Sequence, residues 1–145
     1  MQLKVDGIIR PIFWEHWQDP EAKFDKKEKA KLISNHTKGE KINIIAKSIG
    51  TLVASYVIEN IPEQINKVIV CGIPLNDIGD EEKSVIKKAL FSLPKDNLIC
   101  FQNFRDPHGS LSQVKSFLPP KVKLIHKERS DHEYPYFDEF NEFLK

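Results

Sequence analysis

The sequence predicts an α/β fold: a three-layer α/β/α sandwich around a mostly parallel sheet of about five strands. Five short apolar runs rich in Ile and Val recur along the chain, with little of the polar alternation of strands that have one wet face. The segments between these runs are long enough for crossover helices, which parallel pairing requires. A length of 145 residues fits a single domain, residues 1–145, with one layered core.

The predicted strands and helices alternate along the chain. The apolar runs place strands at residues 8–13, 42–46, 68–73, 98–101 and 122–125. Helical segments are expected at residues 24–34, 51–60, 81–91, 110–117 and 136–144. Pro62, Pro94 and Pro119 follow three of these segments, where proline stops a helix.

Charge and composition argue against several function classes. The 22 basic and 21 acidic residues leave a formal charge of +1, and lysines alternate with acidic residues, as at residues 25–29. This pattern is typical of a solvated helix face, so we expect no nucleic-acid partner. No apolar stretch has the length of a membrane span, and residues 1–7 lack the apolar core of a signal peptide. We therefore expect a cytoplasmic protein with no membrane partner.

The two cysteines do not indicate a disulfide or a metal centre. Cys71 and Cys100 each lie in an apolar run and have no C-x-x-C partner. Buried, reduced thiols are the simpler interpretation. The sequence predicts no metal and no cofactor.

The most informative motif is Ala-Lys-Ser-Ile-Gly at residues 46–50, between a predicted strand and a predicted helix. It matches the G-x-S-x-G turn with Ala in the first position, and such a turn presents a nucleophilic serine, here Ser48. Asp106 and His132 each follow a later apolar run. Sites in parallel sheets form outside the carboxyl ends of the strands, so the three residues are expected at one edge.

Together these residues supply the groups that serine chemistry needs. A serine hydroxyl is a weak nucleophile unless a base takes its proton and a third group orients the base. Ser48 would attack a carbonyl, His132 would accept the proton and pass it to the leaving group, and Asp106 would orient the imidazole. The sequence thus predicts a catalytic triad in the order Ser, Asp, His.

The order of motifs resembles a small, lidless α/β-hydrolase over nearly the whole chain. The resemblance rests on Ala-Lys-Ser-Ile-Gly, then Cys-Gly-Ile-Pro-Leu, Arg-Asp-Pro-His-Gly-Ser and Ser-Asp-His-Glu-Tyr. It implies a serine hydrolase acting on a small-molecule acyl substrate, an ester, thioester or amide, through an acyl-enzyme. It also implies one oxyanion donor, the backbone N–H of Ile49. Residues 73–96 are short where many relatives insert a lid, which predicts an open site.

Candidate pocket residues and rivals to the triad remain open at this point. Trp14 and Trp17 follow the first predicted strand and either line an acyl pocket, together with Pro74, or seal the end of the core. Asp131 is a rival to Asp106 but adjoins the histidine in sequence. His108 and His126 are rivals to His132. A metal site is a weak alternative without tight ligand spacing; its ligands would be His108, His132, Asp106 and Asp131.

One expected element of the resemblance is missing from the sequence. The family's second oxyanion donor lies on a glycine-containing loop upstream, and no such loop precedes residues 8–13. Either residues 8–13 pair directly with residues 42–46, as a right-handed crossover permits, or the authentic start lies upstream. The alternative function is therefore a catalytically impaired or non-catalytic binding module, or an N-terminally truncated product. Exposed sheet edges would then favour a homo-oligomer. A nucleotide binder ranks last because no glycine-rich phosphate loop is present.

Overall fold

Four parallel strands form a single sheet in the order β1-β2-β3-β4 in the computed structural model, which describes residues 3–12 and 25–145. The strands are β1 (Ile42–Lys47), β2 (Ile65–Cys71), β3 (Leu98–Asn103) and β4 (Lys123–Lys127). The helices are α1 (Lys26–His36), α2 (Gly50–Asn60), α3 (Asp80–Ser92), α4 (Leu111–Phe117) and α5 (Phe137–Leu144). Short 3-10 turns η2 (Pro62–Gln64) and η3 (Lys95–Asn97) precede β2 and β3. The predicted α/β class is confirmed.

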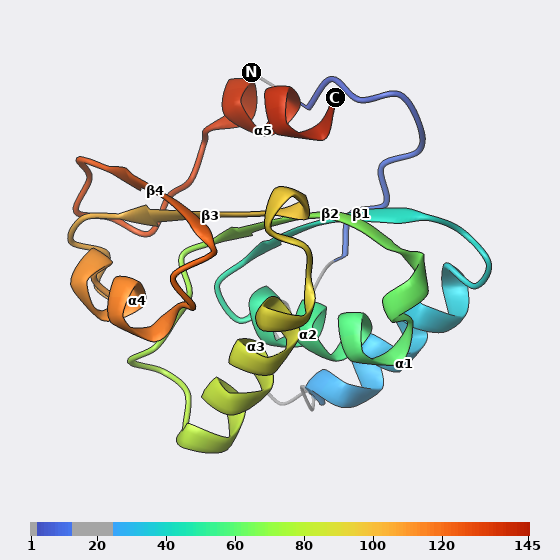
Figure 1. Ribbon diagram of the computed structural model, residues 1–145, viewed down its shortest axis with the longest axis horizontal. Helices are drawn as coiled ribbons and strands as arrows, with labels where there is room; N and C mark the ends of the chain where they lie inside the picture. Colours follow the sequence, from blue (N-terminus) through green and yellow to red (C-terminus); the bar gives the residue numbers. More distant parts are fainter. Residues whose placement is uncertain (1–2, 13–24) are drawn as a thin grey trace.

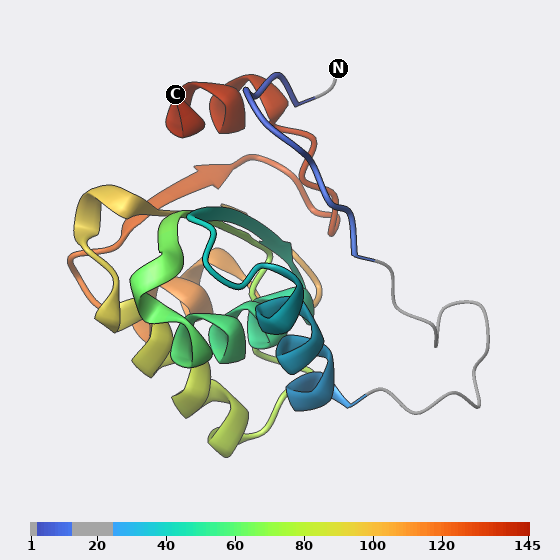
Figure 2. The same ribbon diagram turned by 90° about the vertical axis from the view of Figure 1, so that its right-hand side faces the viewer.

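Helices cover both faces of the sheet, but unequally. Helices α1 to α4 lie on one face, and α5 lies on the other together with the N-terminal segment (Figures 1 and 2). The larger apolar cluster fills the first face and includes Leu52, Val68 and Leu98. A smaller cluster around Ile69 and Phe101 lies under α5. Side chains of a strand alternate between faces, and both faces here are covered, which explains the nearly continuous apolar runs of the central strands.

The local sequence accounts for several element boundaries. Asp25 caps α1, and its Oδ1 accepts a hydrogen bond from the N–H of Glu28 at 3.1 Å. Ser110 and Gln113 cap α4 reciprocally, with side chains that bond each other's backbone N–H groups. Each such bond satisfies an N–H that a helix start leaves unpaired. The five predicted helices and the four later strands are found within a few residues of their predicted positions.

The first predicted strand is wrong. Residues 8–12 have no regular secondary structure, and Phe13 lies outside the described residues. Ile8, Ile9 and Ile12 are 83%, 52% and 44% exposed. Pro11 has no N–H for a strand ladder, and Arg10 is held by an ion pair with Glu40 instead. The sheet therefore has four described strands rather than about five, and no described residue pairs with the outer edge of β1.

Candidate active site

Ser48 lies in a sharp turn between β1 and α2. Its φ of +56° is the only positive value among the non-glycine residues that the structure describes. Its N–H donates to the carbonyl of Cys71 at 3.0 Å, and its own carbonyl accepts from Thr51 N–H at 2.9 Å. The residue therefore ends the pairing of β1 with β2 and begins the helix in one step. A non-glycine residue in the left-handed region is strained, as the G-x-S-x-G turn requires.

Asp106 follows β3 and has a fully buried carboxylate. Three donors surround this carboxylate. Its Oδ2 accepts from the hydroxyl of Tyr134 at 2.6 Å and lies 2.7 Å from Nδ1 of His132, and its Oδ1 accepts from the N–H of His108 at 2.8 Å. A buried charge is tolerated only when it is satisfied in this way. The carboxylate is thus well placed to hold an imidazole.

His132 follows β4, and its side chain is 18% exposed. Because Nδ1 faces the carboxylate of Asp106, the N–H of the neutral ring belongs on Nδ1 and the lone pair on Nε2. Nε2 is buried and has no hydrogen-bond partner among the described residues. In a serine triad this nitrogen faces the nucleophile, and that bond is often absent before substrate binds.

The elbow and the histidine loop meet at the end of β2. A Cβ on Gly72, the first residue after β2, would lie 2.9 Å from Cε1 of His132. The N–H of Ser48 donates to the carbonyl of Cys71, the residue before Gly72. Lys47, which precedes Ser48, forms an ion pair with Glu133, which follows His132. Lys47 Nζ lies 3.5 Å from Glu133 Oε2. Both residues of this ion pair are exposed, so the contact matters as a measure of proximity rather than of stability.

His108 does not occupy the position of the triad base. Its Nδ1 lies 2.5 Å from Oδ2 of Asp77, and its backbone N–H bonds the Asp106 carboxylate. The ring lies beside that of His132, with 4.3 Å between centroids. His126 lies within β4, exposed and outside this cluster.

Asp131 faces away from the imidazole. Its two carboxylate oxygens accept from Nε and Nη2 of Arg129 at 3.0 and 2.7 Å. These hydrogen bonds hold the pKa of Asp131 below its ordinary value. The carboxylate also accepts from the N–H of Glu133 at 3.2 Å, so it caps its own loop.

The other predicted site residues are less completely placed. Ile49 immediately precedes α2, where helix N–H groups lack intrahelical partners and suit an oxyanion. Pro74 is buried in the turn after β2, where its carbonyl accepts from Asp77 N–H at 3.0 Å. Trp14 and Trp17 lie outside the described residues.

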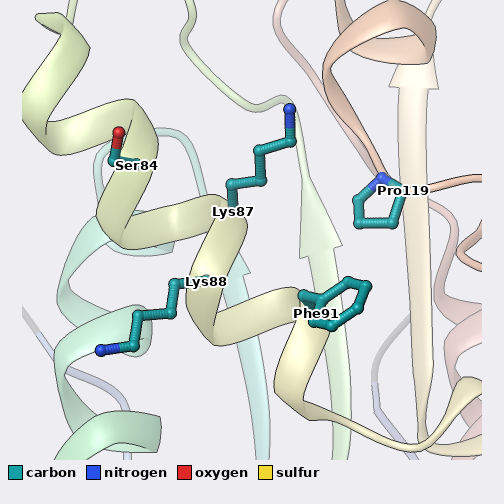
Figure 3. Close-up of a pocket in the computed structure, with 5 residues that line it drawn as sticks. All are labelled: Ser84, Lys87, Lys88, Phe91 and Pro119. Atoms are coloured by element: carbon teal, nitrogen blue, oxygen red, sulfur yellow. The ribbon is translucent and has the colours of Figure 1, made fainter.

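A separate hollow of about 430 Å³ lies along α3 (Figure 3). Its lining comes from the exposed side of α3 and from Pro119, which precedes β4. Phe91, near the end of α3, lies next to Pro119. Phe91 near the end of α3 and Pro119 before β4 lie toward the amino ends of the parallel strands, whereas Ser48 follows the carboxyl end of β1. None of the lining residues is Ser48, Asp106 or His132, so the hollow is separate from the candidate site. The lining residues are Ser84, Lys87, Lys88, Phe91 and Pro119.

Both cysteines are free and buried, and burial raises the pKa of the Cys100 thiol to about 12. Burial also raises the pKa of Cys71 well above its ordinary value. Neither is suited to act as a thiolate nucleophile. In residues 3–12 and 25–145, no group of three or more His, Cys, Asp and Glu side chains is placed to hold a metal ion. No helix in the same ranges combines the length and apolarity needed to cross a membrane.

Two residues of the site were not singled out from the sequence. Tyr134 bonds the acid, and its ring together with His132 leaves no room for a side chain at Gly72, where a Cβ would lie 2.7 Å from Tyr134 Cε2. The sequence held a signal for Tyr134, because it comes two residues after His132 and residues two apart in an extended loop can face the same side. Gly72 stands in the Cys-Gly-Ile-Pro-Leu motif, but the need for glycine appears only when the loop is in place.

The fold defines an α/β protein whose parallel sheet carries a strained serine turn and an Asp–His pair at the carboxyl edge. The family model described as an alpha/beta hydrolase domain matches residues 18–139. The chain therefore belongs to the α/β-hydrolase family, and the resemblance in the motifs is confirmed. Comparison with curated proteins found no match.

Proposed function

We propose that the protein is a serine hydrolase that cleaves a carboxylic ester, thioester or amide through an acyl-enzyme on Ser48. The observation that carries the proposal is the 2.7 Å contact between His132 Nδ1 and the buried Asp106, which leaves Nε2 without a partner among the described residues. The loop of His132 and the turn of Ser48 both contact the end of β2. Family membership supports hydrolysis as the reaction class. The short segment between β2 and α3 supports an open site for small or medium acyl groups.

Each group has one role in the proposed reaction. Ser48 Oγ attacks the substrate carbonyl carbon while His132 Nε2 takes the hydroxyl proton. Asp106 stabilises the imidazolium through Nδ1. The N–H of Ile49 donates to the oxyanion. The imidazolium then protonates the leaving group, and a water molecule, deprotonated by the same nitrogen, releases the acid and restores Ser48.

A second candidate function is a non-catalytic α/β-hydrolase-like binding module. The observation that favours it is the outer edge of β1, which pairs with no described strand. The resemblance implies a second oxyanion donor on an upstream loop, and this donor would be absent in such a module. Loss of one oxyanion donor costs on the order of 10² to 10³ in turnover. A loss of turnover of this size is measurable, so a rate measurement distinguishes an active hydrolase from a binding module.

A fluorophosphonate probe with mass-spectrometric site mapping tests the proposal directly. We expect an adduct at Ser48, none in Ser48→Ala, and none in His132→Ala. His108→Phe, which keeps a flat ring beside His132, should still label, because His108 is not the base. Folded protein without an adduct at Ser48 defeats the enzymatic function and leaves the binding module.

A further inference from the structure

The loop that carries His132 rests on one wholly buried amide, that of Asn103, the last residue of β3. The Asn103 Nδ2 donates to the carbonyl of Asp131 at 3.0 Å and to the carbonyl of Glu133 at 2.8 Å. These two carbonyls flank His132 in the chain. The backbone on both sides of the imidazole is therefore tied to the end of a central strand.

Two tyrosines of the same loop also bond Asn103, one through its side chain and one through its backbone N–H. Tyr136 O–H donates to Asn103 Oδ1, and Asn103 N–H donates to the hydroxyl oxygen of Tyr134 at 3.0 Å. Tyr134 then donates its own proton to Oδ2 of Asp106 at 2.6 Å. Its hydroxyl is thus held from two sides. Burial raises the pKa of Tyr134, which keeps the proton on the hydroxyl.

Tyr134 and His132 share one oxygen of the acid. The Oδ2 of Asp106 is 2.6 Å from the tyrosine hydroxyl and 2.7 Å from Nδ1 of His132. With the His108 N–H on Oδ1, the carboxylate is fixed against rotation about its own axis. If the tyrosine hydroxyl were absent, one of the two contacts that orient Oδ2 would be lost while the imidazole remained.

We propose that Tyr134 is a positioning residue of the catalytic site, whose hydroxyl holds Asp106 Oδ2 in line with His132 Nδ1. Asn103 supports it by fixing the loop that carries both side chains. This inference rests on the proposed function, since it assigns a role within the same triad. Tyr134 acts through Asp106 and makes no contact with the reacting atoms. Its removal should therefore slow the chemical step without weakening substrate binding.

The structure offers a matched control. Tyr136 belongs to the same network and also donates a hydroxyl hydrogen bond, but its partner is Asn103 rather than Asp106. Its ring stacks on Phe101 with 5.8 Å between centroids. Tyr134→Phe and Tyr136→Phe each keep the ring and remove the hydroxyl. Tyr134→Phe loses the bond to Asp106 Oδ2 and the bond from Asn103 N–H, whereas Tyr136→Phe loses the bond to Asn103 Oδ1. Only the first variant removes a donor from the acid.

The experiment compares wild type, Tyr134→Phe and Tyr136→Phe at a temperature where thermal melts show all three folded. The rate of fluorophosphonate labelling at Ser48 should fall about 10- to 100-fold in Tyr134→Phe, by analogy with the loss of groups that orient the ligands of a metal site. With an ester substrate, kcat should fall and KM should stay unchanged. Tyr136→Phe keeps the bond from Tyr134 to Asp106, so it should label clearly faster than Tyr134→Phe.

A second measurement does not depend on activity. The proton that His132 Nδ1 shares with Asp106 should give a downfield ¹H NMR signal, assigned by its loss in His132→Ala. This signal should shift in Tyr134→Phe and stay in place in Tyr136→Phe. Equal labelling rates and equal signals in the two phenylalanine variants would overturn the inference. Failure of wild type to label would instead overturn the proposed function, and the NMR comparison would still decide the role of Tyr134.

Discussion

The two halves of the candidate site are held in place by different means. On the Asp–His side, the loops after β2 and β3 are joined by direct hydrogen bonds. Asn76 donates its N–H to the carbonyl of His108 at 2.9 Å and its Nδ2 to the carbonyl of Pro107 at 3.1 Å. The buried side chain of Gln102 bridges Ile73 N–H and the Gly109 carbonyl at 3.1 and 2.6 Å.

On the serine side, the position depends on backbone strain at one residue. Ser48 holds a φ of +56° at the end of β1, and β1 has no described partner on its outer edge. The side chains of β1 are alternately half-buried and exposed along most of its length, whereas every residue of β3 is buried. Asp106 and His132 are thus prearranged by packing, while Ser48 is presented by a local conformation. Substitutions on the Asp–His side should reduce stability and activity together. Substitutions of Ser48 should reduce activity without an equal loss of stability.

The largest effect is expected for Asp106→Asn. The amide nitrogen cannot accept from either Tyr134 O–H or His132 Nδ1, so at least one buried donor loses its partner. Activity should fall about 10⁴-fold, as for other triads with this change. The free energy of unfolding should fall by about 1–3 kcal/mol. Labelling kinetics and urea denaturation measure the two effects.

Asp131→Asn is the matched control for this change, because Asp131 adjoins His132 in sequence but bonds Arg129. Its activity should stay within a few fold of wild type. An equally large loss in Asp131→Asn would make Asp131 the orienting acid and would remove Asp106 from the triad.

The next effect is expected for Gly72→Ala. Gly72 has a φ of +63°, and an added Cβ would lie 2.7 Å from Tyr134 and 2.9 Å from His132. Gly39 has a φ of +82° with nothing within 4 Å of an added Cβ, so Gly39→Ala carries strain without collision. Strain should cost each variant about 1–2 kcal/mol, and the collision should cost Gly72→Ala about 1–3 kcal/mol more.

Only Gly72→Ala should also slow labelling of Ser48, since it displaces the imidazole. Denaturation curves and labelling rates of both alanine variants provide the comparison. Equal losses of stability, with labelling intact in both, would show that His132 does not pack on the end of β2.

The sequence alone was sufficient for most of the fold because the strands are short buried runs separated by helices with clear stops. It failed at residues 8–12, where the isoleucines suggested a strand. A strand also needs a partner with free N–H and carbonyl groups, and Pro11 and the Arg10–Glu40 ion pair direct this segment elsewhere. An apolar pattern records side chains and does not record whether the backbone of a segment pairs with the open edge of a sheet.

The candidate site was predictable to the extent that it depends on chain order. Asp106 and His132 were predicted from the segments that follow two parallel strands, and the structure brings the two together. Tyr134 and Asn103 were not predicted, because their roles depend on loop conformation and on which side chains share a buried oxygen. The alternation of residues 132 and 134 is compatible with Tyr134 beside His132, but nothing in the sequence identifies the buried oxygen that the two side chains share.

The smallest effect separates stability from activity on the serine side. Ser48→Gly relieves the strain of a positive φ, so it should be more stable than Ser48→Ala by about 0.5–1 kcal/mol, after the greater freedom of glycine in the unfolded chain is subtracted. At Ser84, exposed within α3, the order should reverse, with glycine about 1 kcal/mol less stable than alanine. Denaturant titration of the four variants measures both differences. If glycine were also the less stable residue at position 48, the turn would not be strained. The expected order instead means that Ser48 is kept in a strained conformation at a cost in stability, while no described non-glycine residue of the packed Asp–His half has such a positive φ.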